Sequence, residues 1–123
     1  MKSKHPLLKN FGFAFEGLKT AFVNGRNFRI QVFTGIAAFI LGFVLKLDST
    51  EWLDLILVIS LVLMLELVNT TIEAVVDIAS PEIQEKAKIA KDVAAASVLV
   101  ASIASVLIGA FLFIPKILNF LLQ

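Results

Sequence analysis

Three long apolar segments constrain the fold of this chain more than any other feature of its sequence. They cover residues about 29–47, 52–78 and 92–115. As α-helices with a rise of about 1.5 Å per residue, each is long enough to cross a hydrocarbon core of roughly 30 Å. Of the 123 residues, 59% are hydrophobic, which is more apolar surface than a soluble domain of this size could bury. We therefore expect one all-α integral membrane domain, residues 1–123, with three transmembrane helices.

The segment about 7–24, which precedes the first span, has a different pattern. Phe11, Phe15, Leu18 and Phe22 recur at helical spacing, and the charged side chains lie largely elsewhere on the helix. This pattern predicts an amphipathic helix that lies in the membrane interface. A soluble helix packed on a core is the alternative interpretation.

The distribution of charge predicts the orientation in the membrane. The N-terminal segment and the 78–92 connection hold nine of the eleven Lys and Arg residues. Because cytoplasmic loops carry an excess of Lys and Arg, we expect both to be cytoplasmic, with the first loop and the C-terminus outside. The net charge of +1 provides no basic face for nucleic acid. The absence of cysteine excludes disulfides and thiolate metal sites.

A polar stripe interrupts the second apolar segment. At about 100° per residue, the side chains of Glu66, Asn69, Glu73 and Asp77 fall within roughly 80° of one another on a helix. An ionisable group at membrane depth costs on the order of 2.5–3.5 kcal/mol and indicates a functional site. The stripe approaches the cytoplasmic end of its helix, where ATP is available.

The residue types along this stripe suit phosphoryl transfer. Glu66, the deepest carboxylate, suits a base that takes a proton from an alcohol. Glu73 and Asp77, one turn apart, could hold a hard cation through oxygen ligands. Lys91 and Asp92 could contact a nucleotide, with the lysine on its phosphates and the aspartate on a sugar hydroxyl or a metal. Because phosphoryl transfer depends mostly on positioning and charge neutralisation, these groups are sufficient.

Two other interpretations of the stripe remain open. Intramembrane Asn and Glu side chains also join helices to one another through hydrogen bonds. Membrane-embedded acids also form ion or proton paths, as in small multidrug transporters. The amphipathic N-terminal segment and the polar 78–92 connection fit a nucleotide site better than a channel.

Several helix ends can be predicted from capping residues and proline. Ser49 or Thr50 is expected to cap the second span. Ser80 and Pro81 favour a break and a restart, with the serine as N-cap and the proline in the first helical position. The polar segment that follows is expected to form a short helix or loop, and Pro115 to close the third span.

Two stretches of this sequence carry a family resemblance. ELVNTTIEAVVD at 66–77, followed by AKIAKDVAA at 87–95, resembles the prokaryotic diacylglycerol kinase family. FRIQ at 28–31 and LFIPKI at 112–117 are similar to its undecaprenol kinase branch. The similarity extends over nearly the whole chain, from about Phe11 to Ile117.

The resemblance implies a homotrimeric, multi-pass kinase of the bacterial plasma (inner) membrane, with active sites shared between subunits. It implies transfer of the γ-phosphate of ATP, with Mg²⁺, to the hydroxyl of a lipid alcohol, undecaprenol or diacylglycerol. Residue by residue, it implies that Glu66 is the general base, Asn69 the active-site amide and Glu73 a metal ligand. It also implies that the nucleotide is contacted by Asp77, Lys91 and Asp92. Phe13 stands at a position near the nucleotide that is often Tyr.

The chain departs from the family pattern at two further positions. Gly25 stands where the family usually has a Glu that serves as the second metal-binding carboxylate, and Gln84 replaces a common His. Asn24, Glu16 or Asp77 could substitute for the missing carboxylate. The departure at Gly25 gives a second hypothesis: a catalytically weakened or inactive member that acts as a membrane lipid-binding or assembly protein.

Overall fold

The computed structural model describes residues 6–123, and these residues form four helices connected by short segments. The N-terminal Lys2 and Lys4, which count toward the predicted orientation, lie outside the described residues. The helices are α1 (Leu7–Asn24), α2 (Arg26–Val44), α3 (Ser49–Ala79) and α4 (Glu85–Leu121). By length and composition α2, α3 and α4 can each cross a membrane. The expected all-α class and the three long apolar helices are therefore confirmed.

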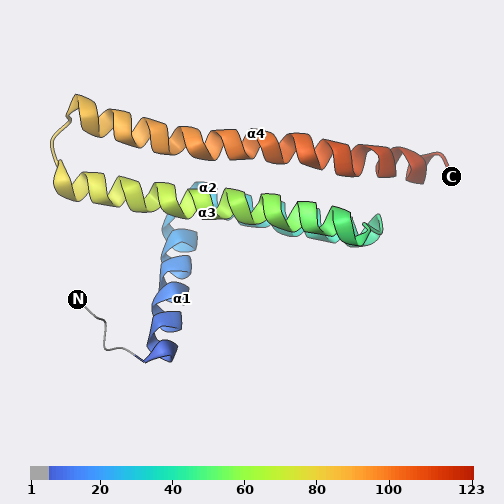
Figure 1. Cartoon of the computed structure of the whole chain (residues 1–123), viewed down its shortest axis with the longest axis horizontal. Coiled ribbons are helices and arrows are strands. Elements are labelled where there is room, and N and C mark those ends of the chain that lie inside the picture. The colour runs from blue at the N-terminus through green and yellow to red at the C-terminus, as the bar shows by residue number, and fades with distance from the viewer. Residues whose placement is uncertain (1–5) are drawn as a thin grey trace.

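The three long helices lie side by side, and α1 projects away from them at a steep angle (Figure 1). The chain reverses direction between α2 and α3 and again between α3 and α4. The extensive contact between α3 and α4 and the smaller contact between α2 and α3 hold these helices together. A core cluster of Leu47, Leu55, Leu112 and Phe113 closes the end of the bundle at the α2–α3 turn.

A single arginine joins α1 to α2 at the sharp corner between them. The Arg29 side chain in α2 reaches back, and its Nη1 donates hydrogen bonds to the carbonyl oxygens of Phe22 at 2.8 Å and Val23 at 2.6 Å. The last carbonyls of a helix lack intrahelical donors, and a cation there also interacts favourably with the helix dipole. The rings of Phe22 and Phe33 meet edge to face across the same corner, with centroids 5.9 Å apart. Arg29 therefore caps α1 and fixes its angle to α2.

The start of α3 differs from the expected cap by one residue. Asp48, rather than Ser49 or Thr50, is the N-cap: its carboxylate accepts from the Glu51 N–H, and the Glu51 carboxylate accepts from the Asp48 N–H, both at 2.9 Å. This reciprocal capping box satisfies two backbone donors, which a lone hydroxyl cap would not do. Glu51 also pairs with Lys116 of α4 at 3.1 Å, so the same carboxylate connects α3 to α4.

The expected restart at Ser80 and Pro81 is wrong. Ser80 is instead the C-cap of α3: its N–H donates to the Val76 carbonyl at 2.8 Å, and its hydroxyl donates to the Glu82 carbonyl at 3.0 Å. With its hydroxyl used in this turn, Ser80 cannot cap a new helix, and α4 begins only after Gln84. The polar segment expected to be separate therefore includes the first turns of α4.

Pro115, where the third span is expected to close, does not end its helix. The α4 helix continues through Pro115 and ends at Leu121. Proline removes one backbone donor, but membrane helices tolerate it where neighbouring groups satisfy the freed carbonyl. The apolar residues after Lys116 continue the helical pattern, so the proline does not end it.

Replacing Arg29 with Met removes the guanidinium and keeps most of the aliphatic chain. The two capped carbonyls then lose their donor, at roughly 1.5–3 kcal/mol per hydrogen bond to a charged group. We expect the mobility of α1 to increase. It is measured from the spectrum of a spin label attached to a cysteine introduced into α1, since the chain has no other cysteine. Arg26→Met is the control, because the exposed Arg26 side chain makes no hydrogen bond or ion pair within residues 6–123. Equal mobility in the two variants would contradict the capping role.

Candidate active site

The polar stripe on α3 runs from buried to exposed positions. Glu66 and Asn69 are each only 7% exposed and are the buried polar side chains among residues 6–123. Glu73 and Asp77, one and two turns farther along, are exposed. Burial of an acid or amide is costly without hydrogen-bond partners, so the partners of the two buried groups determine how the site is arranged.

Glu66 has a partner that the sequence analysis did not identify. The Gln31 Nε2 on α2 donates to the Glu66 Oε2 at 3.1 Å. The Gln31 Oε1 is buried and accepts no hydrogen bond within the described part of the chain. The available signal was an amide in an otherwise apolar span, at the end of the FRIQ stretch. Gln31 therefore belongs to the candidate site.

Asn69 links the buried end of the stripe to the exposed end. Its Nδ2 donates to the Glu73 Oε1 at 3.2 Å, while its Oδ1 is buried and unpartnered among residues 6–123. An amide oxygen beside a carboxylate suits a hard cation such as Mg²⁺, which commonly uses one or two carboxylates together with substrate phosphates. Residues 6–123 of one chain contain no cluster of three or more His, Cys, Asp or Glu side chains that could hold a metal. The donor types therefore fit Mg²⁺, but one chain supplies only part of a coordination shell.

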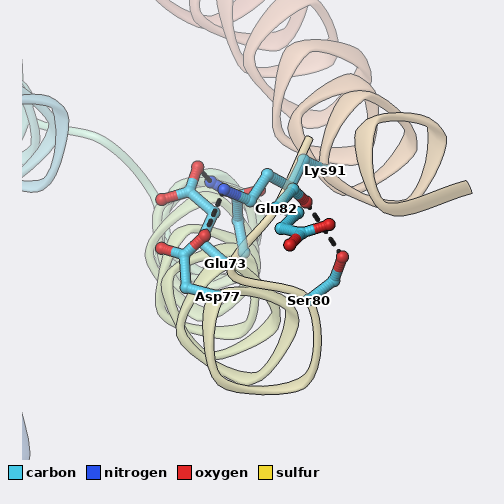
Figure 2. A network of polar contacts seen from close by, with 6 residues as sticks. Glu73, Asp77, Ser80, Glu82 and Lys91 are labelled. Atoms are coloured by element: carbon cyan, nitrogen blue, oxygen red, sulfur yellow. Dashed lines mark hydrogen bonds and ion pairs between the residues drawn. The ribbon is translucent and has the colours of Figure 1, made fainter. Parts of the chain in front are cut away.

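Two ion pairs stand at the exposed end of the stripe. Lys91 on α4 reaches across to the Asp77 carboxylate on α3, and Glu73 lies beside this pair (Figure 2). One turn earlier on α4, Lys88 pairs with Asp92 at 2.6 Å. Both lysines are exposed enough to exchange their carboxylate partners for a bound anion.

These ion pairs border a pocket of 230 Å³ at the α3–α4 connection. Its lining combines the two lysines with polar groups of the loop, where the Ser80 hydroxyl contacts the Glu82 carbonyl (Figure 2). The structure thus brings Asp77, Lys91 and Asp92 to one pocket. Lys91 and Asp92 each pair with another residue and do not pair with each other.

Phe13 is not brought to this pocket within one chain. It lies on α1 with 59% of its surface exposed. The α1 helix projects away from the connection between α3 and α4 (Figure 1). Phe13 is therefore not among the residues that line the pocket.

Gly25 lies at the α1–α2 corner, close to the level of Asn69 and Glu73 on α3. It precedes Gln31 by six residues, or about 9 Å along α2, and the antiparallel α3 places residues Asn69 to Glu73 at roughly this level. A Cβ at Gly25 would lie 2.5 Å from the Ala21 carbonyl oxygen, which accepts the Gly25 N–H at 2.8 Å. The corner in this geometry therefore excludes the expected glutamate on steric grounds.

Gly25→Ala is expected to destabilise the protein, because the added Cβ meets backbone that must shift. Overpacking of this kind typically costs about 1–3 kcal/mol. The measurement is thermal unfolding in detergent. Gly12→Ala is the matched control: a Cβ there has nothing within 4 Å, and alanine favours the helix. Unchanged stability of Gly25→Ala would show that the corner accommodates a side chain.

Sequence comparison places this arrangement in a family. Residues 12–113 match the family model described as prokaryotic diacylglycerol kinase. The chain belongs to the prokaryotic diacylglycerol kinase family. The resemblance identified from the 66–95 stretches is therefore confirmed. Together with the three long apolar helices, membership identifies a multi-pass membrane protein.

The relatives carry two different names. A diacylglycerol kinase of Synechocystis sp. is 44% identical over 92% of this chain, and this chain spans 65% of that relative's length. An undecaprenol kinase of Bacillus subtilis is 37% identical over 89% of both chains. A diacylglycerol kinase of Escherichia coli K12 is 34% identical over 82% of this chain, and the match covers 83% of that relative's length.

Proposed function

We propose that this chain is an ATP-dependent lipid kinase. It transfers the γ-phosphate of ATP to the hydroxyl of a membrane lipid alcohol, either undecaprenol or diacylglycerol, and releases a lipid phosphate. The observation that carries this proposal is the α3 stripe, which runs continuously from the buried Glu66 to a lysine-lined pocket. Such a path would bring a lipid hydroxyl and a nucleotide together, and the kinase names of the relatives support the proposal.

Each part of the stripe has a proposed role. Glu66 is the base that accepts the proton of the alcohol. Asn69 and Glu73 hold Mg²⁺, which neutralises phosphate charge when it is bound. Asp77, Lys91 and Asp92 bind the nucleotide, and Lys91 exchanges its aspartate partner for a phosphate.

The complete site is proposed to form in a homotrimer with shared active sites. Residues 6–123 of one chain contain no cluster of three metal-binding side chains, and Phe13 does not line the pocket, so we propose that a neighbouring subunit contributes to the site. We place the protein in the bacterial plasma membrane with its N-terminus cytoplasmic, in line with the lysines around the α3–α4 connection. The α1 helix then lies in the interface, consistent with its steep angle to the three spans (Figure 1).

A catalytically weakened or inactive member is the second candidate. The observation that favours it is Gly25, where the corner geometry excludes a carboxylate. Such a protein would retain the fold and act in lipid binding or assembly. Unlike the kinase, it would show no Mg²⁺-dependent stabilisation by ATP.

The direct test is Mg²⁺- and ATP-dependent phosphorylation of undecaprenol or diacylglycerol in mixed micelles. We expect phosphorylation by the wild type and none by Glu66→Gln, which removes the base but keeps the size of the side chain. Asp54→Asn, at the opposite and exposed end of α3, is the control and should remain active. Absence of transfer to either lipid by a folded wild-type protein would refute the kinase function.

Glu73→Gln is expected to raise the Mg²⁺ concentration needed for half-maximal activity by about tenfold or more. The neutral amide retains the size of the carboxylate but loses the charge that attracts the cation. The measurement is a Mg²⁺ titration of activity at fixed ATP, compared with Asp54→Asn. An unchanged Mg²⁺ requirement would remove Glu73 from the metal site.

A further inference from the structure

Gln31 connects the Glu66 carboxylate to an apolar groove within the membrane-spanning helices. The groove has a volume of 340 Å³ and lies between α2, α3 and α4. Side chains from all three helices line it, including Gln31, Gly35, Val62, Leu63, Ser102 and Gly109. The polar groups in this lining are the Gln31 amide and the hydroxyls of Thr34, Ser102 and Ser105, and Gln31 is the one that contacts Glu66.

The orientation of the Gln31 amide is determined by Glu66. Its NH₂ group donates to the Glu66 Oε2 at 3.1 Å, and the reversed amide would set two acceptors against each other. The Gln31 Oε1 is buried and unpartnered among residues 6–123. Buried polar atoms are nearly always paired, so this oxygen indicates that a donor is missing from the isolated chain.

The hydrogen bond also distinguishes the two oxygens of Glu66. Gln31 occupies Oε2, and Oε1 remains available for a proton. A general base must lie within hydrogen-bond reach of the proton it accepts, so a carboxylate free to rotate would be less effective.

We propose that Gln31 is a positioning residue for Glu66, and that the groove holds the hydrocarbon chain of the lipid alcohol. This inference rests on the lipid kinase function proposed above. The hydroxyl at the end of the chain then reaches the free oxygen of Glu66. The O–H proton passes to this carboxylate, the alcohol oxygen bonds to the γ-phosphorus, the bond to the β–γ bridging oxygen breaks, and ADP leaves.

The first experiment measures kcat and KM of the purified full-length protein with lipid alcohol and MgATP. Gln31→Met removes both polar atoms at nearly constant length, and we expect kcat to fall at least tenfold with an unchanged KM for MgATP. In a Glu66→Asp background, where the shortened carboxylate no longer reaches Gln31, the same change should alter kcat less than twofold. Asn119→Met removes an exposed amide at the far end of α4 and is the control.

The outcomes separate the inference from the function on which it rests. If the wild type transfers phosphate and Gln31→Met is equally active, the positioning role alone is wrong. If Gln31→Met lowers kcat equally in the wild-type and Glu66→Asp backgrounds, Gln31 has a structural role, and the positioning role is also overturned. If Gln31→Met does not fold, Gln31→Asn, which withdraws the amide by one methylene, takes its place with the same expected loss. A folded wild type without activity overturns both proposals.

The second experiment tests the occupant of the groove. Gly109 lines the groove and a Cβ there has nothing within 4 Å, so Gly109→Leu adds an apolar side chain at the groove without a clash at its Cβ. We expect this variant to raise KM for the lipid alcohol at least fivefold and to leave KM for MgATP unchanged. If it instead changes the oligomeric state with unchanged KM for lipid, a helix of a second copy occupies the groove and the assignment to lipid is overturned.

Discussion

The hydrogen bond between Gln31 and Glu66 is the constraint on which the rest of the structure depends. It places a carboxylate and an amide in contact between two helices otherwise suited to lipid. A polar pair of this kind fixes the depth and register of α2 against α3, because slippage by one turn would leave both groups unpaired in an apolar environment. The positions of Asn69, Glu73 and Gly25 relative to one another follow from this register.

The α1–α2 corner shows a conflict between folding and metal binding. Arg29 caps the end of α1, and Gly25 allows the chain to turn within one residue. The same position lies at the level of Asn69 and Glu73, where an additional carboxylate would complete a cation site. A side chain at Gly25 would collide with backbone that the corner uses for its own hydrogen bond. This chain therefore has a tight corner, and under the proposed function further metal ligands would come from substrate phosphates or another subunit.

Hydropathy and helical periodicity were sufficient to predict the coarse fold. The three long apolar helices follow from run length alone, and the stripe from Glu66 to Asp77 follows from 3.6-residue periodicity. The family resemblance added roles for these residues that spacing alone leaves open. Contact of Asp77 with Lys91 follows once α3 and α4 are known to be antiparallel neighbours.

The errors arise where the outcome depends on contacts that local pattern does not specify. Asp48 caps α3 because Glu51 returns a second hydrogen bond, whereas Ser49 has no such partner. Ser80 closes α3 rather than starting α4, because its hydroxyl bonds the turn. Pro115 remains inside a helix because its apolar surroundings continue the helical pattern. Gln31 was missed because its partner is 35 residues away, and a single amide in an apolar span does not reveal which residue it contacts.

We infer that the buried pair of Gln31 and Glu66 specifies helix register and serves chemistry, but does not raise the stability of the fold. The most direct measurement compares wild type with the double variant Gln31→Met, Glu66→Met by thermal unfolding in detergent and by phosphate transfer. Replacing both partners of a buried polar contact with apolar groups of similar shape is often neutral or stabilising, because the desolvation cost of the polar groups is removed. The account predicts an equal or higher Tm together with loss of phosphate transfer. A lower Tm with phosphate transfer retained would contradict it.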